Sequence, residues 1–191
     1  IPNSTKEFER KVATRILKIV QVGSLAGDGT FIYQFIDWVI GQGGNVEFDI
    51  YSQNVNLEIM NYVNTTNSPY IRILRAIPYS DLPNVLINYD VGVVLYKGDL
   101  ENVIYCLPNK VNEYLACGLN VWYSDVLVTT QTFSKENPDY PLFAVDFSKG
   151  IQMEVPPISN EPFKYRHWHE DAVKPLMEVL QASLNDSVHT P

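Results

Sequence analysis

Residues 108–118 read Pro-Asn-Lys-Val-Asn-Glu-Tyr-Leu-Ala-Cys-Gly, a stretch with the features of a short helix that has marked ends. Proline is tolerated in the first turn of a helix, and glycine is favoured just after the last turn. Between them Val111, Tyr114 and Leu115 stand at helical spacing, so they can share one buried face. The stretch therefore predicts a helix that packs on a core and begins at its proline end.

Lys110 and Glu113 fall near the N-terminal turn of this predicted helix. The first N–H groups of a helix have no partner within it, and together with a cation they suit a phosphate. A fixed carboxylate can accept hydrogen bonds from two neighbouring sugar hydroxyls. We interpret this combination as a nucleotide-sugar site, although taken alone Glu113 also fits a glutamate that stabilises a first helical turn and Lys110 an exposed lysine.

Strand and helix patterns alternate along the chain on both sides of this stretch, which is typical of a parallel sheet with crossover helices. The predicted strands span 16–22, 46–51, 70–74, 91–96, 120–123 and 143–147. The predicted helices span 31–41, 55–63, 80–87, 109–117 and about 170–184. We expect Thr30 to cap the first helix, and Ser80 or Asp81 to cap the third. The fold class is α/β, a Rossmann-like doubly wound parallel sheet.

Ligands of such sheets bind beyond the carboxyl ends of the strands, where three loops of this chain should meet. The first, 23–30, is rich in glycine, so its backbone can approach an anion closely. The second follows the third strand at 75–79, and the third spans 97–108. We expect these loops and the predicted helix 109–117 to surround one site.

Composition excludes several other classes of protein. The chain has 191 residues and a formal net charge of −8, from 14 basic and 22 acidic side chains. This balance argues against a nucleic acid or an anionic membrane surface as partner. The apolar runs are strand-length, and we expect no transmembrane segment. His167 and His169 lack the further ligands of a zinc site, so we predict no metal.

The stretch 108–121 resembles the "P-x-K-x-x-E-Y-x-A-x-G-x-P-V" segment of GT-B glycosyltransferases, specifically the retaining group of family 4, with Asn120 in place of the second proline. Ile1-Pro2-Asn3-Ser4 is similar to the "I-P-N-G" segment that links the two domains of that family. The resemblance implies that 1–14 is a linker stub and that 15–191 is the nucleotide-sugar-binding domain. It also implies that the acceptor domain of the same enzyme is missing from this chain.

The same resemblance assigns roles to individual residues. It implies that Glu113 binds the ribose hydroxyls and that Lys110, with the N–H groups of Asn109, binds the donor diphosphate; these two side chains are the expected catalytic residues. The remaining expected donor-binding residues come from the first two loops and are Gly23, Ser24, Leu25, Arg75, Ile77 and Tyr79. Ile77 would lie against the nucleobase, with Tyr79 at its edge.

Two departures from the family concern charged residues. Ser24 stands where the family has an arginine, and no lysine occurs in 23–30. Tyr105 stands where much of the family has a glutamate that contacts the sugar, so Asn102 or the backbone of 105–108 would meet the sugar instead.

The function that the resemblance implies is transfer of a sugar, with retention, from a UDP- or GDP-type donor to a glycan or lipid-linked acceptor. Surface polysaccharide synthesis in the cytoplasm is the expected setting, no cofactor is expected, and this chain alone should be inactive. Two alternatives stay open: a degenerate, non-catalytic nucleotide-sugar-binding module, and a nucleotide-sugar 2-epimerase domain.

Overall fold

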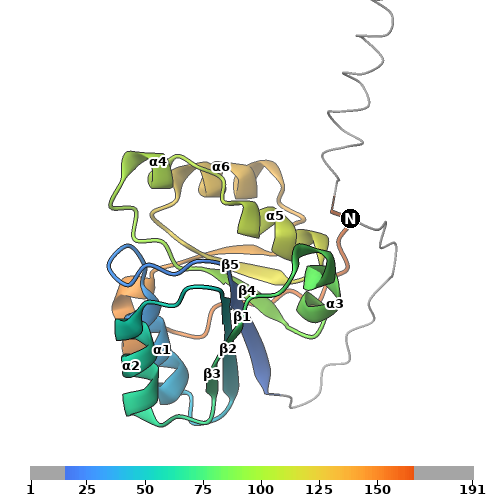
Figure 1. Cartoon of the computed structure of the whole chain (residues 1–191). Helices are drawn as coiled ribbons and strands as arrows, with labels where there is room; N and C mark the ends of the chain where they lie inside the picture. The colour runs from blue at the N-terminus through green and yellow to red at the C-terminus, as the bar shows by residue number, and fades with distance from the viewer. Residues whose placement is uncertain (1–15, 166–191) are drawn as a thin grey trace, which may run out of the picture.

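The computed structural model describes residues 16–165. Their strands form one six-stranded sheet in the order β3-β2-β1-β4-β5-β6 (Figure 1). All neighbouring strands are parallel. The strands are β1 (Leu17–Val22), β2 (Val46–Ser52), β3 (Ile71–Arg75), β4 (Val91–Val94), β5 (Asn120–Ser124) and β6 (Leu142–Val145). The predicted α/β class and the doubly wound parallel sheet are confirmed.

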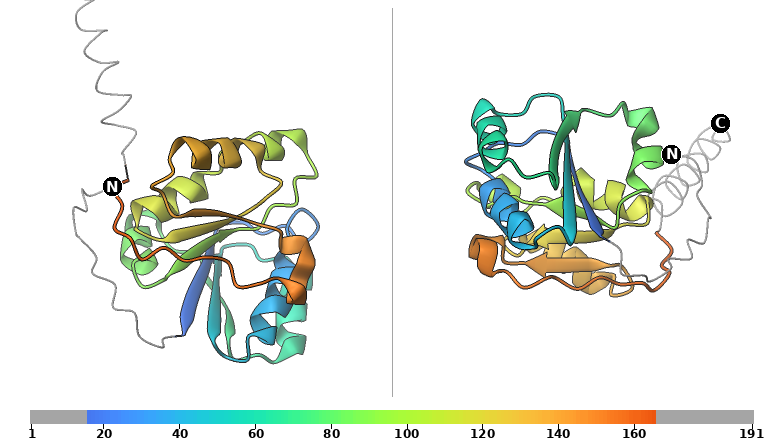
Figure 2. Two further views of the ribbon diagram at one scale, coloured as in Figure 1. Left: turned by 180° about the vertical axis from the view of Figure 1, so that it is seen from behind. Right: turned by 90° about the horizontal axis from the view of Figure 1, so that it is seen from below.

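Helices cover both faces of the sheet, as the two further views show (Figure 2). They are α1 (Ile32–Gly41), α2 (Leu57–Thr66), α3 (Leu82–Leu86), α4 (Glu101–Ile104), α5 (Asn109–Ala116) and α6 (Val128–Glu136), with the 3-10 turns η1 (Tyr79–Asp81) and η2 (Phe147–Gln152). One apolar core gathers residues of α1, α2 and η2, and a second core on the other face gathers residues of α3 and α5. The sheet is therefore covered on both faces, which accounts for its nearly continuous apolar strands.

Strand order reverses between β1 and β4, because the chain runs outward from β1 to β3 and then returns to pair β4 with β1. All four residues of β4 are buried, as expected for a central strand. In open α/β sheets the crevice at such a reversal is where ligands bind. The loops after β1 and β4 meet there, since Thr30 and Tyr96 form an isolated antiparallel bridge.

Two predictions about helix N-termini were wrong. Thr30 does not cap α1, because its hydroxyl donates to the carbonyl of Ala26 and the helix begins at Ile32. Helix α2 starts two residues later than expected and is capped by Asn56, whose side chain accepts from the N–H of Glu58. Asp81 occupies the N-cap position of α3, as predicted, although its side chain makes no capping bond. The predicted final helix, about 170–184, lies outside the described residues.

The segment after η2 passes the sheet and is held by side chains of the domain. The indole of Trp122 donates to the carbonyl of Pro157 at 3.0 Å. Asn120 is buried, and its amide bonds the backbone of Ser159 in both directions, at 2.8 and 3.3 Å. A proline has no side-chain amide that could make these bonds. This role explains why asparagine is useful where the family motif has proline.

Candidate functional site

A cavity of about 610 Å³ opens at the carboxyl ends of the central strands, on the face that α5 covers. Its lining comes from the end of β1, the segment from 77 to 82, Tyr96 after β4, α4 and the first turn of α5. The residues that line it are Val22, Gly23, Ile77, Tyr79, Leu82, Tyr96, Asn102, Val103, Cys106, Pro108, Asn109, Lys110 and Glu113. Six residues of the predicted donor site are therefore brought together: Gly23, Ile77, Tyr79, Asn109, Lys110 and Glu113.

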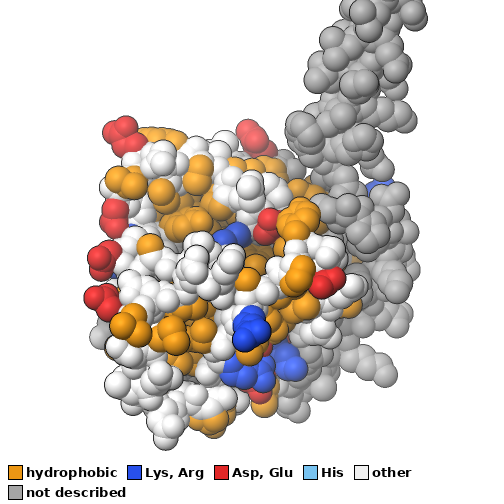
Figure 3. Space-filling view, in the orientation of Figure 1, with side chains coloured by type: hydrophobic (Ala, Val, Ile, Leu, Met, Phe, Trp, Pro, Cys, Tyr) orange, Lys and Arg blue, Asp and Glu red, His pale blue; other side chains and the backbone are white. Residues whose placement is uncertain are grey.

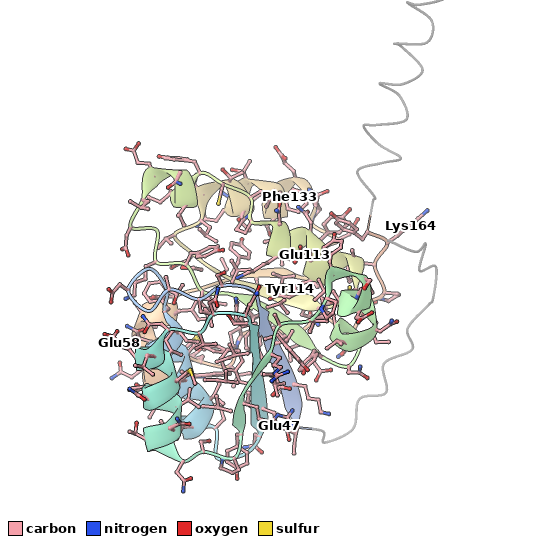
Figure 4. All side chains as sticks on the ribbon, in the orientation of Figure 1. Glu47, Glu58, Glu113, Tyr114, Phe133 and Lys164 are labelled. Carbon is pink, nitrogen blue, oxygen red and sulfur yellow. The ribbon has the colours of Figure 1, made fainter. Side chains whose placement is uncertain are left out.

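Tyr114 fixes α5 on the sheet and so fixes the residues of this cavity. Its ring is buried against Gly92, where an added Cβ atom would lie 2.3 Å from two ring carbons. Its hydroxyl accepts a hydrogen bond from the N–H of Val22 at 3.0 Å, at the end of β1. Figure 4 shows Tyr114 beside Glu113 at the centre of the molecule, where α5 meets the sheet. The predicted helix and its buried face, including Tyr114, are thus observed.

Lys110 extends from the first turn of α5 to the backbone of Gly23. A Cβ atom added to that glycine would lie 3.2 Å from Cε and 3.6 Å from Nζ of Lys110, and the glycine has a positive φ of 94°. The ammonium also lies 5.5 Å from the centre of the Tyr96 ring. Burial lowers the pKa of Lys110 to about 8, while Glu113 opposes this shift. A desolvated ammonium at the first turn of a helix is well placed for an anion.

Glu113 lies one helical turn after Lys110 and lines the same cavity. Burial raises the pKa of Glu113, and the charge of Lys110 opposes the rise. Each group therefore partly offsets the desolvation of the other. No hydrogen bond or ion pair between them is observed, so the carboxylate and the ammonium both remain available to a ligand within the described structure.

The opposite wall is formed by residues after β3. Ile77 is half-buried, Leu82 is buried, and Tyr79 is exposed at the cavity's edge. Beyond this wall the hydroxyl of Tyr89, just after α3, donates to buried Asp49 at 2.5 Å. Arg72 donates two further bonds to the same carboxylate, at 2.6 and 2.7 Å. This network ties the chain after α3 to the sheet and so supports the wall.

Three of the predicted donor-binding residues do not line the cavity. Ser24 is exposed, and Leu25 is buried in the core, where it pairs with Val55 in an isolated bridge. Arg75 is exposed at the end of the edge strand β3. Among residues 23–30 only Gly23 lines the cavity. The glycine-rich loop thus contributes its first residue to the site, and the other seven lie elsewhere.

Sequence reasoning missed Val22, Leu82, Val103 and Cys106 as lining residues. Tyr96 follows an apolar strand on the edge of the sheet where ligands bind, and it lines the cavity as that position predicts. Val103 and Cys106 lie on and just after α4, a helix of four residues that is too short to show a periodic pattern. Asn102, proposed as a sugar contact, does line the cavity, whereas Tyr105 is exposed outside it.

The part of the chain that the structure describes, 16–165, contains no cluster of three or more His, Cys, Asp or Glu residues that could hold a metal ion. His167 and His169 lie outside that range. Within the same range no helix is long and apolar enough to cross a membrane.

Comparison with solved structures identifies similar folds among GT-B glycosyltransferases. A variant of Staphylococcus aureus TarM, solved in complex with fondaparinux, alpha-GlcNAc-glycerol and UDP, superposes over 78% of this chain with a TM-score of 0.51 and 14% identity. The fold is that of a Rossmann-like domain of the GT-B glycosyltransferases. The resemblance predicted from residues 108–121 is therefore confirmed for the fold.

Two further structures are similar at lower scores. The pneumococcal O-GlcNAc transferase GtfA, in complex with UDP and GlcNAc, matches 62% of this chain with a TM-score of 0.46 and 18% identity. An E. coli trehalose-6-phosphate protein bound with UDP-2-fluoro glucose matches 73% with a TM-score of 0.47 and 12% identity. This chain spans 23% to 37% of the length of these three proteins. No protein family and no curated protein sequence matches the chain.

Proposed function

We propose that this chain is the donor-binding part of a retaining glycosyltransferase that uses a UDP- or GDP-type sugar donor. Lys110 and the first N–H groups of α5 would bind phosphate, and Glu113 would bind the ribose hydroxyls. Ile77 and Tyr79 would contact the nucleobase, with Asn102 near the sugar. The acceptor site would belong to a further domain of the same enzyme, and domain closure would complete the active site.

The carrying observation is that a half-buried carboxylate and a desolvated ammonium line one cavity at the reversal of strand order. Both side chains project from one short helix, and Tyr114 fixes the position of that helix on β1 and β4. A preorganised cation next to a helix N-terminus also stabilises a departing phosphate without a metal ion. The GT-B fold supports the same assignment, and in TarM the solved complex contains UDP.

A glycan or lipid-linked acceptor of a surface polysaccharide completes the proposal, with the reaction in the cytoplasm. The two cysteines, Cys106 and Cys117, are both free thiols, as is usual for a protein of a reducing compartment.

Calorimetric titration of the 191-residue chain with UDP, GDP, ADP and CDP tests the proposal. We expect one nucleotide to bind, and Glu113→Gln to weaken its affinity about tenfold or more, since a hydrogen bond to a charged group contributes about 1.5–3 kcal/mol. Glu58→Gln is the matched control, because Glu58 is exposed on α2, at the left edge of the view and away from Glu113 (Figure 4). Absence of binding by all four nucleotides, or equal affinity of Glu113→Gln and the parent, would contradict the proposal.

A second candidate, a non-catalytic nucleotide-sugar-binding module, is favoured by the observation that residues 24–30 do not reach the cavity. Whole enzyme that binds donor but neither transfers nor hydrolyses its sugar would support this candidate. Sugar transfer by the whole enzyme that is lost in Glu113→Gln would instead support the glycosyltransferase.

A further inference from the structure

The side chain of Lys110 approaches two surfaces of the cavity, the backbone of Gly23 and the ring of Tyr96. Its Cε and Nζ would lie 3.2 and 3.6 Å from a Cβ atom added at Gly23, so a larger residue there would crowd the lysine. The N–H of Gly23 donates to the carbonyl of Tyr51 at 2.8 Å, which fixes this surface to the sheet. The Lys110 ammonium lies 5.5 Å from the centre of the Tyr96 ring, within the range of a cation–π interaction.

No ion pair joins Lys110 to a carboxylate within residues 16–165. Glu113, one helical turn on, attracts the ammonium without bonding to it. An ion pair would neutralise the lysine and occupy its N–H donors. The face of an aromatic ring attracts a cation through its quadrupole and has no net charge. The ring of Tyr96 can therefore hold the ammonium and leave its charge available to an anionic ligand.

Tyr96 is itself held by the end of the glycine-rich loop, although most of that loop does not line the cavity. Thr30 and Tyr96 form an isolated antiparallel bridge. The carbonyl of the residue before Tyr96 accepts from the N–H of Phe31 at 2.7 Å, and the N–H of the residue after it donates to Gly29 at 3.0 Å. The loop thus fixes the backbone from which the Tyr96 ring extends into the lining of the cavity.

The position of Lys110 matters because it is the one basic residue of the cavity lining among residues 16–165. Figure 3 shows the Lys and Arg side chains of this face gathered mainly over the strands in the lower half of the view, away from α4 and α6 at the top. A lysine side chain has many rotamers, and holding it in place before a ligand arrives removes that entropic cost from binding. A residue that holds Lys110 should therefore strengthen the binding of an anion.

We propose that Tyr96 is a positioning residue of the site, whose ring holds the Lys110 ammonium at the cavity and leaves its N–H groups able to donate to a phosphate group of the ligand. The inference rests on the proposed function and adds a residue that acts on the nucleotide through Lys110. The ring of Tyr96 acts here, and its hydroxyl is not needed. The glycine-rich loop contributes as the segment that fixes Tyr96.

Calorimetric titration of the 191-residue chain and its variants with UDP, GDP, ADP and CDP tests the inference. For the nucleotide that binds, we expect Tyr96→Leu to weaken the affinity about threefold to tenfold, because the cation–π attraction is lost. Tyr96→Phe keeps the ring and should stay within about twofold of the parent. Tyr105→Leu is the matched control, since Tyr105 is exposed outside the cavity, and it should bind as the parent does.

A nuclear magnetic resonance measurement on the unliganded chain shows whether the ring acts through Lys110. Protons that lie over the face of an aromatic ring resonate upfield. The ε-methylene signals of Lys110, identified by their loss in Lys110→Met, should therefore lie upfield of those of exposed lysines in the parent, in Tyr96→Phe and in Tyr105→Leu. In Tyr96→Leu they should move to the position of exposed lysines, and the same spectra show whether each variant is folded.

Equal affinity of folded Tyr96→Leu and the parent would overturn the inference and leave the proposed function intact. An affinity loss as large in Tyr96→Phe as in Tyr96→Leu would also overturn it, because the hydroxyl would then act on the ligand. Lys110 signals of the parent at the position of exposed lysines would overturn it whether or not Tyr96→Leu folds. If none of the four nucleotides binds, the proposed function fails and the inference fails with it.

Discussion

Helices α1 and α5 each begin just beyond the carboxyl end of a central strand, yet they use their first turns differently. In α1 the N-cap residue Phe31 donates its N–H to the carbonyl of Leu95, and five residues of the helix are buried. In α5 three residues are buried, and Lys110 and Glu113 of the first turns face a cavity. The first turn of α1 is therefore engaged with the core and does not face a cavity. The first turn of α5 faces the cavity and includes the desolvated ammonium of Lys110.

The comparison explains why a glycine-rich loop before α1 is not sufficient evidence for a phosphate site. Such a loop binds anions when its N–H groups and the following helix N-terminus point at the ligand. Here the loop bonds to itself and to the body of the domain, so the proposed anion site rests on α5.

Truncation of the core helix should have the largest effect on stability. Trp38 is fully buried, and its indole donates to the carbonyl of Met153 at 2.8 Å. We expect Trp38→Ala to lower the free energy of unfolding by about 4 kcal/mol, measured by urea denaturation. Nucleotide affinity of the folded fraction should stay unchanged, and Leu57→Ala, at an exposed position, should have almost no effect on either quantity. Loss of nucleotide affinity in folded Trp38→Ala would contradict the view that α1 stabilises the core without contributing to the nucleotide site.

Displacement of α5 should affect both stability and binding. In Gly92→Ala the new Cβ atom would clash with the Tyr114 ring at 2.3 Å, and we expect destabilisation of about 3 kcal/mol from overpacking. Nucleotide affinity should fall as well, because Lys110 and Glu113 move with the helix. Gly29→Ala is the control, since no atom lies within 4 Å of its added Cβ. Stability is measured by urea denaturation and affinity by calorimetric titration. Unchanged nucleotide affinity in Gly92→Ala would show that the packing of Tyr114 on Gly92 does not position the site.

Removal of the buried charge should stabilise the unliganded protein. The pKa of Lys110 falls from its ordinary value near 10.5 to about 8 on folding, so the unfolded chain binds more protons between these pH values. Stability of the parent should therefore rise between about pH 8 and pH 10.5, and this rise should be absent in Lys110→Met. At pH 7 we expect Lys110→Met to be more stable by about 2 kcal/mol, and to have lost nucleotide binding. Thermal denaturation at several pH values is the measurement. A Lys110→Met variant less stable than the parent at pH 7 would contradict the view that burial of the Lys110 ammonium destabilises the unliganded protein.

The smallest effect is expected for the hydrogen bond between α5 and β1. Tyr114→Phe removes the acceptor of the Val22 N–H, and we expect it to lower the free energy of unfolding by about 1–2 kcal/mol. Because the ring remains packed on Gly92, nucleotide affinity should change less than in Gly92→Ala. A Tyr114→Phe variant with the affinity loss of Gly92→Ala would show that the bond, more than the packing, orients the helix.

The sheet and α5 could be predicted from the sequence because their signals are local. The strands are nearly continuous apolar runs, and the site helix has proline and glycine at its ends. Helix α6 was not predicted, because only Thr130 of its nine residues is buried and its sequence, VTTQTFSKE, has little apolar periodicity. The lining of the cavity by α4 was missed for a related reason, since four residues cannot show a period.

The glycine-rich loop shows where sequence reasoning reached its limit. Whether Ser24 or Leu25 faces a ligand depends on tertiary contacts, such as the bridge between Leu25 and Val55, that no local pattern records. In the same way, no local pattern records that the Thr30 hydroxyl donates to the loop carbonyl of Ala26 while Phe31 becomes the N-cap residue of α1.

A crystal structure of the chain with the nucleotide that binds most tightly is the most direct test of the central claim. The account predicts ribose hydroxyls within about 3 Å of the Glu113 carboxylate and a phosphate oxygen within about 3 Å of the Lys110 ammonium. A nucleotide bound elsewhere, or one whose phosphates lie along residues 24–30 without contact to Lys110, would contradict it.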